Sequence, residues 1–565
     1  MLRIEFSLVL LALLIAFMYP SLGSQWFEKL ERRFAQLSRR RVTSIILVGV
    51  TALVLRAALL PIEPIPQPIA RDEFGYLLMS DTFAHRRMAN PTHPMWMHFE
   101  ATFVNQRPMY VSKFFPAQGT LLAIGQVVFG HPFWGVWLGI GLMCAAICWM
   151  LQGWFAPPWA LLGALLAMIR LGTFSYWANS YLGCALPAIG GALVLGALPR
   201  IKRRQRIGDS LLMGFGLLLL ASSRPLEGLI FSFPVAAALM VWIWNRKSDR
   251  RRIFTRALAP GALVLAVGFA ALFYYFWRTT GSPFRTPYQV NLQTQDPIPI
   301  FPWQSVRPIP QYRHPEMRAL VTGWEMDQYN LVRSHFVISS IARCIQLYVF
   351  FVGPALTLPF LMLGATWRTF PKRSRPDVRL LLIVFSVSAF GLMLPIYCGP
   401  TYAAPLTCVI YALLLDSMRS IRRWRLRGKP AGLLIVRAVP VICLLMVFIR
   451  AGASFPGVPT PQMLPPIWCS PHLFEQVSRE SVQAAIESRL GLHIALVRYG
   501  SHHSEGVGGG LDWVQNLADI DRQKVIWAHD MGAENEELIR YYKDRTVWLV
   551  EPDKNPPQVS PYPGF

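Results

Sequence analysis

The chain has 565 residues, of which 53% are hydrophobic and 15% charged, and its mean hydropathy is +0.36. This composition excludes an ordinary soluble globular protein, because one or two cores could not bury so much apolar surface, and it predicts a polytopic membrane protein. The formal net charge of +24 would suit a nucleic-acid partner, but the basic residues form short runs between apolar segments, so we expect no nucleic acid.

The first apolar stretch, residues 5–22, is followed at once by the basic segment 24–41. A signal peptide also begins with an apolar stretch, but this one is long and has basic residues after it, so an uncleaved first helix is predicted. Three parts are expected. They are a first helix with a basic cytoplasmic segment (1–42), a membrane domain with large outer loops at 62–114 and 277–334 (43–455), and an extracytoplasmic α/β domain (456–565).

Apolar runs of sufficient length predict about twelve transmembrane helices. The predicted spans are residues 5–22, 43–61, 132–152, 158–177, 182–199, 208–223, 228–244, 258–276, 337–365, 378–397, 403–417 and 431–451. When the spans alternate across the membrane, five basic segments lie on one side and together hold 28 Lys and Arg residues. They are residues 24–41, 200–206, 245–256, 368–379 and 419–429. The two long loops on the other side hold 11 over about twice the length. The positive-inside rule therefore places both loops and the C-terminal tail outside the cytoplasm, in a multi-pass protein of the cytoplasmic (inner) membrane, as in a bacterium.

The tail beyond a proline-rich linker near Phe455 has a different pattern. HIALVRYG, KVIWAHDM and TVWLVEP are typical of buried strands, and helical patterns alternate with them. The predicted fold is thus an all-α polytopic membrane bundle with a small C-terminal α/β domain. The glycine-rich YGSHHSEGVGGGLDW lacks a nucleotide-binding spacing. Polar residues near strand or loop ends are expected to form a solvated rim, with acceptor binding as the alternative; they are Asp512, Asp519, Asp521, His529 and Asp530.

Two adjacent carboxylates, Asp72 and Glu73, follow the second apolar run in ARDEFGYLL. One interpretation is structural, in which Asp72 caps the following helix and Glu73 lies in its first turn. The same loop carries Lys113 in YVSKFFPAQG, just before an amphipathic stretch meets the membrane again. A cation and a carboxylate at the lipid surface suit a substrate with a lipid tail and a phosphate head.

These features resemble the C-type (GT-C) membrane glycosyltransferase superfamily, which includes protein O-mannosyltransferases and aminoarabinose transferases acting on lipid A. The resemblance rests on the acidic pair after an early helix, on Lys-Phe-Phe-Pro at Lys113, which looks like the Lys-Pro-Pro of that loop, and on TYAAPL (401–406). TYAAPL resembles the Arg-Tyr-x-x-Pro of a late helix, although Thr401 stands where the family has arginine.

The resemblance implies inverting transfer of a sugar from a polyprenyl-phosphate donor to a lipid, glycan or protein acceptor at the outer face. Asp72 would be the base that activates the acceptor, Glu73 its support, and Lys113 the cation that binds the donor phosphate. The chemistry is reasonable, because a carboxylate can take the proton of a poorly nucleophilic hydroxyl while a phosphate leaving group needs charge stabilisation.

Two arginines are further candidates for binding the donor phosphate. Arg224 directly precedes a proline, and the alternative is a pair with Glu227 that only stabilises the turn. Arg170 lies deep in an apolar run, so it either faces a watery cavity or caps helix carbonyls. The candidates for sugar or acceptor binding are Tyr76, Asn179, Tyr181, Glu227 and Tyr402, because amides and aromatic faces commonly hold sugars; interfacial belt residues are the alternative for the aromatic ones.

A divalent metal is a further possibility, because His85, His93, His98 and Glu100 lie close together in the sequence. Their spacing matches no closed metal site, so exposed loop histidines are expected and no cofactor is assigned. The alternative functions are a transporter or flippase for a lipid-linked sugar and a polysaccharide polymerase or ligase. Transporters place ionisable groups near the midplane of the membrane, whereas the predicted spans hold few acidic residues.

Overall fold

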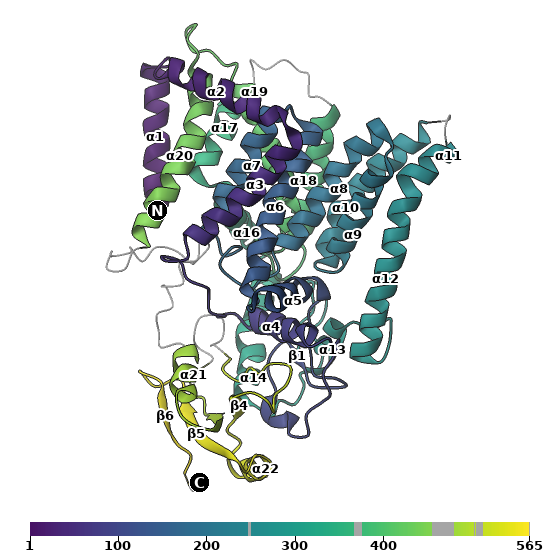
Figure 1. Cartoon of the computed structure of the whole chain (residues 1–565), viewed down its shortest axis with the longest axis vertical. Helices are drawn as coiled ribbons and strands as arrows, with labels where there is room; N and C mark the ends of the chain where they lie inside the picture. The colour runs from purple at the N-terminus through teal and green to yellow at the C-terminus, as the bar shows by residue number, and fades with distance from the viewer. Residues whose placement is uncertain (247–249, 366–375, 455–478, 502, 504–511, 564–565) are drawn as a thin grey trace.

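The computed structural model describes residues 1–246, 250–365, 376–454, 479–501, 503 and 512–563. The molecule is elongated, with a helical bundle at one end and a small sheet domain at the other (Figure 1). Between them lies a region of short helices and loops, residues 59–132 and 281–335, which we call the loop layer. The proline-rich linker and most of the glycine-rich stretch fall outside the described residues.

The three regions contain the following elements. The bundle and its ends hold α1 (Leu2–Met18), α2 (Ser24–Arg39), α3 (Arg41–Ala58), α6 (Phe133–Trp154), α7 (Pro157–Leu171), α8 (Ala185–Arg204), α9 (Ile207–Ala221), α10 (Pro225–Trp244), α11 (Arg250–Ile253), η2 (Phe254–Leu258), α12 (Ala259–Thr280), α16 (Phe336–Phe351), α17 (Gly353–Ala365), α18 (Pro376–Met393), η5 (Ala404–Leu406), α19 (Thr407–Ile421) and α20 (Ala431–Ala453). The loop layer holds α4 (Arg71–Ala84), η1 (Trp96–Phe99), β1 (Val104–Asn105), β2 (Val111–Ser112), α5 (Pro116–Phe129), α13 (Pro287–Thr294), α14 (Pro315–Ala319), η3 (Leu320–Glu325) and α15 (Met326–Ser334). The C-terminal domain holds α21 (Arg479–Glu487), β3 (Leu492–Val497), β4 (Val525–His529), η8 (Gly532–Glu534), α22 (Asn535–Tyr541), β5 (Arg545–Glu551) and β6 (Gln558–Pro561).

Seven helices among the described residues are long and apolar enough to cross a membrane. They are Arg41–Ala58, Phe133–Trp154, Ala185–Arg204, Pro225–Trp244, Arg251–Thr280, Ala404–Ile421 and Ala431–Ala453. An eighth span is possible if Pro315–Ser334 and Phe336–Phe351, which meet at a bend of 108°, count as one. The remaining predicted spans coincide with shorter helices, among them α1, α7, α9 and α18. Helix length and composition therefore support seven or eight spans among the described residues, and the predicted number of twelve is not confirmed.

The span predicted at 337–365 is not one helix, because α16 ends at Phe351 and α17 begins at Gly353. Gly353 has a φ of +62°, a conformation that residues with a side chain rarely adopt. A Cβ atom at this position would lie 2.3 Å from Nη2 of Arg170. The guanidinium of Arg170 donates hydrogen bonds to the carbonyls of Val349 and Phe350, which would otherwise be unpaired at the end of α16.

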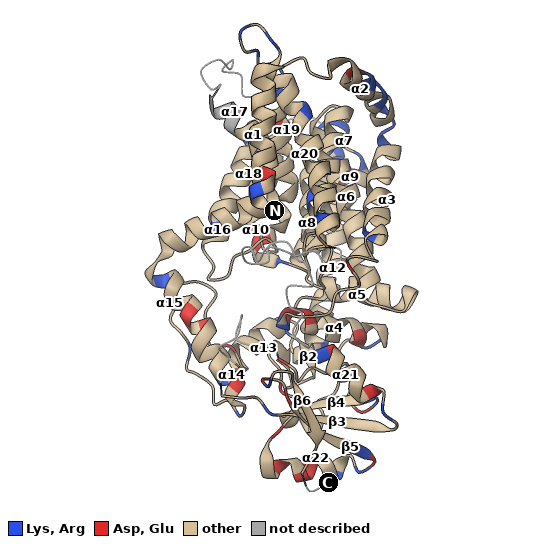
Figure 2. Ribbon diagram, turned by 90° about the vertical axis from the view of Figure 1, so that its left-hand side faces the viewer, with Lys and Arg blue, Asp and Glu red and all other residues tan. Residues whose placement is uncertain are grey.

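Charged residues are distributed unevenly along the long axis of the molecule. Lys and Arg gather at the end that carries α2, whereas most Asp and Glu residues lie in the loop layer and the C-terminal domain (Figure 2). This is the distribution expected if the loop layer lies outside the cytoplasm.

The C-terminal domain contains a four-stranded sheet in the order β4-β3-β5-β6. The three strands expected from the sequence, β3, β4 and β5, are parallel, and β6 adds an antiparallel edge that the sequence did not suggest. One face of the sheet packs on the loop layer, where Leu78, Phe99 and Tyr110 share a hydrophobic core with Ile494 and Ile526. The domain is therefore docked against the region that carries the acidic pair.

Candidate functional site

The acidic pair lies in the first turn of α4, but its two members have different roles. Asp72 was predicted to cap this helix, and that prediction is wrong, because the N-cap is Ala70 and Asp72 is the second helical residue. The carboxylate of Glu73 closes the helix end instead. Its Oε2 accepts hydrogen bonds from the backbone N–H groups of Ile69 and Ala70, both at 2.9 Å. A carboxylate three residues after the N-cap can reach back in this way, whereas that of Asp72 cannot.

Glu73 also ties α4 to a distant loop. Its Oε1 accepts a hydrogen bond of 2.8 Å from the backbone N–H of Tyr181, and its side chain is buried. Burial raises the pKa of Glu73, although these three backbone bonds oppose the shift. Because both oxygens are engaged, Glu73 positions α4 rather than exchanging protons.

Asp72 lies in a different environment from its neighbour. Its side chain is half-buried, and its carboxylate accepts no hydrogen bond from the part of the chain that the structure describes. The charges of Lys113, Arg224 and Arg71 favour its ionised form, but burial outweighs them and raises the pKa of Asp72. Lys113 follows β2 and Arg224 precedes α10, so separate segments bring these cations to one carboxylate.

Lys113 is buried among aromatic rings. Its Nζ lies 3.4 Å from the ring centre of Phe103 and 5.3 Å from that of Tyr288. The adjacent Phe114 stacks on Tyr76 with ring centres 4.5 Å apart. Burial lowers the pKa of the Lys113 ammonium group, and nearby carboxylates oppose this shift. The predicted candidates Asp72, Tyr76 and Lys113 are thus brought together.

Arg224 joins this group through Tyr402, whose ring centre lies 4.3 Å from Cζ of the guanidinium. The alternative interpretation was a pair with Glu227, whose charge does act on Arg224, although no ion pair within 4.0 Å joins these two described residues. Glu227 and Tyr402 instead line a small cavity of about 10 Å³. Thr401, which stands where the motif that TYAAPL resembles has arginine, is buried and bonds to the Tyr176 hydroxyl at 2.8 Å. A guanidinium nevertheless reaches Tyr402, from Arg224.

Three other candidates are occupied by structural contacts. Arg170 pairs with Glu5 and caps the end of α16, which favours the carbonyl-capping alternative over phosphate binding. Asn179 donates two hydrogen bonds of 2.9 Å to backbone carbonyls of its own loop. The hydroxyl of Tyr181 donates to the carbonyl of Pro66 at 3.0 Å. Asn179 and Tyr181 thus hold the loop that Glu73 ties to α4. None of the three residues is carried into the proposed site.

Two acidic residues that the sequence did not single out lie near Lys113. They are Asp296, just after α13, and Glu325, the last residue of the π-helical segment η3. Both side chains are buried, and their charges act on the Lys113 ammonium group. No local motif marks either residue in the long loop 277–334.

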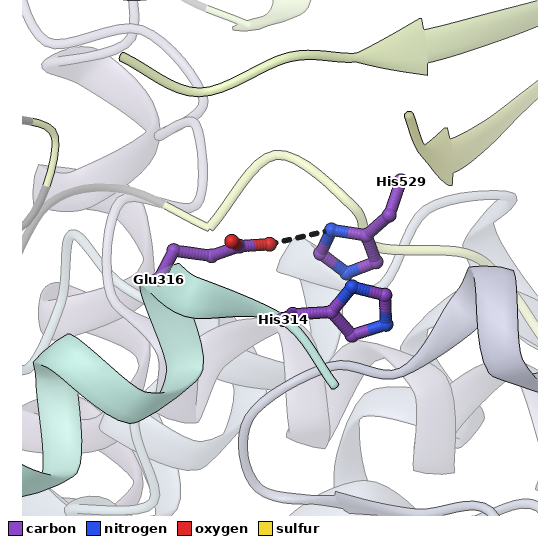
Figure 3. Close-up of side chains that lie close together, drawn as sticks. All are labelled: His314, Glu316 and His529. Carbon is purple, nitrogen blue, oxygen red and sulfur yellow. Dashed lines mark ion pairs between the residues drawn. The ribbon is translucent and has the colours of Figure 1, made fainter. Parts of the chain in front are cut away.

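A separate cluster could hold a metal ion. His314, Glu316 and His529 each offer one ligand atom, and these atoms lie within 4.8 Å of one another (Figure 3). Nε2 of His529 lies 2.7 Å from the Glu100 carbonyl, and Nε2 of His314 lies 2.8 Å from that of Met97. If both Nε2 atoms carry the proton, both Nδ1 atoms are available to a metal, as is usual for metal-binding histidines. A site with three protein ligands is also typical of zinc.

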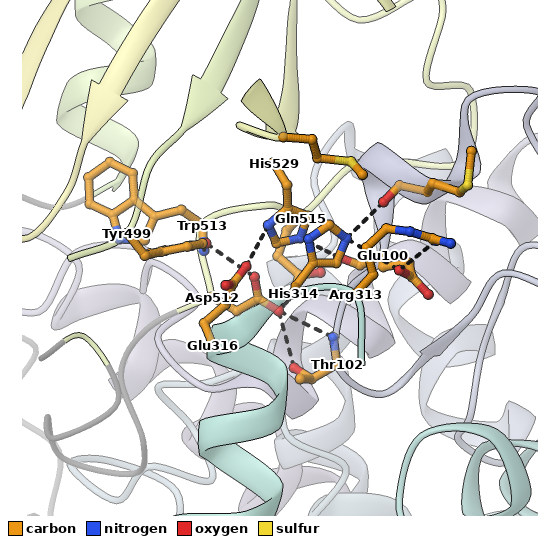
Figure 4. Close-up of polar contacts among 12 residues, drawn as sticks. Glu100, Thr102, Arg313, His314, Glu316, Tyr499, Asp512, Trp513, Gln515 and His529 are labelled. Atoms are coloured by element: carbon orange, nitrogen blue, oxygen red, sulfur yellow. Dashed lines mark hydrogen bonds and ion pairs between the residues drawn. The ribbon is translucent and has the colours of Figure 1, made fainter. Parts of the chain in front are cut away.

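The prediction of exposed loop histidines is only partly correct, because His93 and His98 are buried. His93 contacts the C-terminal domain, with its Nε2 3.0 Å from Oδ1 of Asp521. The expected solvated rim is also wrong for two of its members, Asp512 and His529. Asp512 accepts hydrogen bonds of 3.2 Å from the backbone and the hydroxyl of Thr102 (Figure 4). These polar residues attach the domain to the loop layer.

Neither a protein-family model nor a curated protein sequence matches the chain. Solved structures do resemble it. ArnT from Cupriavidus metallidurans in the apo state is 12% identical over 90% of this chain and 92% of that chain, with a TM-score of 0.50. The oligosaccharyltransferase of Archaeoglobus fulgidus in a complex with zinc and sulfate is 12% identical over 90% of this chain and 67% of that chain, with a TM-score of 0.49. ArnT is a membrane glycosyltransferase of the GT-C type, so the chain has the fold of the C-type membrane glycosyltransferases.

Proposed function

We propose that the chain is an integral membrane glycosyltransferase that moves a sugar from a polyprenyl-phosphate donor to an acceptor at the outer face of the cytoplasmic membrane. The observation that carries the proposal is the convergence of Asp72, Lys113 and Arg224, from three separate segments, where the bundle meets the loop layer. The fold supports it, because a membrane glycosyltransferase has the same fold.

The three residues have complementary roles in the proposed reaction. Asp72 accepts the proton of the acceptor hydroxyl while the acceptor oxygen forms a bond to the anomeric carbon of the donor sugar. The bond between that carbon and the phosphate oxygen breaks, and its electron pair leaves with the polyprenyl phosphate. Lys113 and Arg224 stabilise the negative charge of the leaving group. Attack from the face opposite the phosphate inverts the configuration of the sugar.

The lipid tail of the donor has a candidate position on α16. One face of this helix is apolar and borders a wide-open hollow of about 470 Å³, which is lined by Phe336, Val337, Ser340, Ile341, Cys344, Ile345 and Tyr348. It begins at Phe336, the first residue after the sharp bend that joins α15 to α16. A prenyl chain lying there would leave its phosphate close to the loop layer, which carries Lys113.

The test uses the full-length protein in lipid nanodiscs. Undecaprenyl-phosphate-linked mannose, galactose and arabinose, each labelled in the sugar, are offered with cell-envelope extract as the source of acceptors. We expect the parent to release undecaprenyl phosphate from at least one donor and to transfer the label. Asp72→Asn should lower the rate by about 10²–10⁴-fold, the usual contribution of a general base. The matched control is Asp327→Asn, an exposed acid on α15, which should leave the rate unchanged.

Two results would contradict the proposal. Undiminished transfer by Asp72→Asn would show that this carboxylate is not the base. Movement of an intact sugar-linked lipid across vesicles, without consumption, would instead favour a transporter.

A further inference from the structure

A second acidic pair, Asp296 and Glu325, lies near the proposed catalytic residues and has no role in the mechanism above. Glu325 is only 3% exposed, and its Oε2 is buried without a hydrogen-bond partner among the described residues. Asp296 is 8% exposed and accepts one hydrogen bond of 3.0 Å from the backbone N–H of Ile298. A buried carboxyl oxygen without a partner is costly, so its retention requires an explanation.

Three segments are held together around this pair. Ile298, Val321 and Ile396 belong to one hydrophobic core, and the backbone N–H of Ile396 donates to the carbonyl of Ile300 at 2.9 Å. This packing fixes Asp296 and Glu325 beside Tyr397, whose hydroxyl is also buried with no partner among the described residues. The ring of Tyr397 stacks on Trp324, the neighbour of Glu325, with ring centres 6.3 Å apart. Three polar side chains therefore converge with unused hydrogen-bonding capacity.

The pair also lies next to the cation assigned to the donor phosphate. The charges of both Asp296 and Glu325 act on the Lys113 ammonium group, and so does that of Asp72. The Lys113 side chain is flanked by the ring of Tyr288 from α13, the helix that precedes Asp296. If Lys113 binds the donor phosphate, the sugar bonded to that phosphate is the part of the donor that could reach Glu325.

We propose that Asp296, Glu325 and Tyr397 form the subsite for the hydroxyl-rich sugar of the donor and set the preference among sugars. This inference rests on the proposed function, since it assumes a phosphate-linked sugar at Lys113. Sugar hydroxyls both donate and accept hydrogen bonds, which matches a phenol beside two carboxyl groups. Discrimination follows because a donor that lacks a matching hydroxyl leaves buried polar groups unpaired.

The protonation of the pair fits this role. Burial and the charge of Asp296 raise the pKa of Glu325 to about 8, with Asp72 adding to the shift and Lys113 and Arg71 opposing it. The other titratable groups that face the pair are Arg307, whose charge acts on Asp296, and the tyrosines Tyr312, Tyr288 and Tyr397. Below this pKa Glu325 is a neutral carboxylic acid, which can donate one hydrogen bond and accept others.

The test measures binding by the full-length protein in nanodiscs. The probes are bare undecaprenyl phosphate and undecaprenyl phosphate linked to mannose, galactose or arabinose. We expect the parent to bind at least one sugar-linked lipid about tenfold or more tightly than the bare lipid, the discrimination that polar contacts can provide. Glu325→Ala and Asp296→Ala should reduce this ratio to near one while binding of the bare lipid is kept. Asp327→Asn, on the helix that follows Glu325, is the matched control and should leave the ratio unchanged.

A pH series separates hydrogen bonding by a neutral acid from a packing role. In the parent the ratio should fall as the pH rises through about 8, where Glu325 ionises. Glu325→Gln resembles the neutral acid, so it should keep the ratio at all of these pH values. The subsite is overturned if no sugar-linked lipid binds better than the bare lipid, or if Glu325→Ala weakens all of them equally.

The same measurements separate this inference from the proposed function. A parent that shows the expected preference in binding but transfers no sugar contradicts the proposed function and supports the subsite. A parent that transfers sugar, and whose preference survives both alanine substitutions, contradicts the subsite alone.

Discussion

Glu5 and Arg170 form an ion pair inside the helical bundle, with 3.4 Å between Glu5 Oε1 and Arg170 Nη1. The same Glu5 oxygen accepts a hydrogen bond of 3.1 Å from the backbone N–H of Ala355, at the start of α17. The pair therefore joins α1, α7 and the break between α16 and α17. These contacts fasten α1 to the bundle.

Removing either partner should destabilise the protein strongly. Glu5→Ala or Arg170→Leu leaves a buried charge uncompensated, which costs about 3–5 kcal/mol in soluble proteins. We expect a clear fall in the thermal unfolding temperature of the detergent-solubilised protein, and a smaller fall for the double variant than the sum of the two. Glu28→Gln is the control, because Glu28 pairs with Arg32 on the exposed face of α2. Additive losses in the double variant would show that the two charges do not interact.

The pH dependence of transfer should report the ionisation of Asp72. A base must be deprotonated, so the rate should fall as the pH drops through the pKa of Asp72, which burial raises. Lys113 opposes that shift, so Lys113→Met should move the acidic limb to higher pH. The measurement is the initial rate of transfer against pH at saturating donor. Lys543→Met changes an exposed lysine of the C-terminal domain and should not move the limb. An unmoved limb in Lys113→Met would place the titrating group elsewhere.

The two adjacent acids should differ in what their substitution damages. Glu73 accepts three backbone hydrogen bonds, and a bond to a charged group contributes about 1.5–3 kcal/mol. Glu73→Ala and Glu73→Gln should therefore lower both the unfolding temperature and the activity. A glutamine also presents an NH₂ group where a backbone N–H requires an acceptor. Asp72→Asn should lower activity at an unchanged unfolding temperature. An equal loss of stability from substitutions at both positions would show that Asp72, like Glu73, has a structural role.

The features that could be predicted from sequence are those determined by residues close together in the chain. Apolar runs and basic segments are local, so most bundle helices were predicted near their observed positions. Asp72 and Lys113 could be selected for the same reason, because the acidic pair and Lys-Phe-Phe-Pro are local patterns. The break before Gly353 could not be predicted, since it depends on the reach of Arg170 from another helix.

The missed residues of the site share one property, which is that distant segments form their environments. Glu325 is an ordinary acid in a long loop until folding brings it near Lys113 and Asp296. His314 and His529 come from the loop layer and the C-terminal domain, and no spacing rule relates them. The burial of polar residues expected on a solvated rim has the same origin, since nothing in the tail itself shows that it packs on another region.

Docking of the C-terminal domain should depend on two buried acids that bridge it to the loop layer. Oδ2 of Asp81, in the loop layer, accepts a hydrogen bond of 2.9 Å from the backbone N–H of Ala518 in the C-terminal domain. Asp512, in the C-terminal domain, accepts hydrogen bonds from Thr102 in the loop layer. We expect Asp81→Ala and Asp512→Ala to speed the release of a C-terminal fragment in limited proteolysis. Asp544→Ala, an exposed acid of the same domain, is the control. Equal release rates in all three variants would mean that apolar packing alone holds the domain.

Zinc bound by His314, Glu316 and His529 should strengthen the attachment of the C-terminal domain to the loop layer. After removal of bound metal, adding Zn²⁺ should raise the unfolding temperature of the parent. A ligand at one hundred times its Kd stabilises the folded state by about 2.7 kcal/mol. His314→Gln and His529→Gln should remove this response. His503→Gln is the matched control, because His503 lies in the same domain and pairs with Asp553 instead. Metal content measured by mass spectrometry should give one zinc per chain in the parent. An unchanged unfolding temperature in the parent, or an equal rise in every variant, would show that the cluster serves only as an ion pair between His529 and Glu316, whose Nδ1 and Oε1 atoms are 2.7 Å apart.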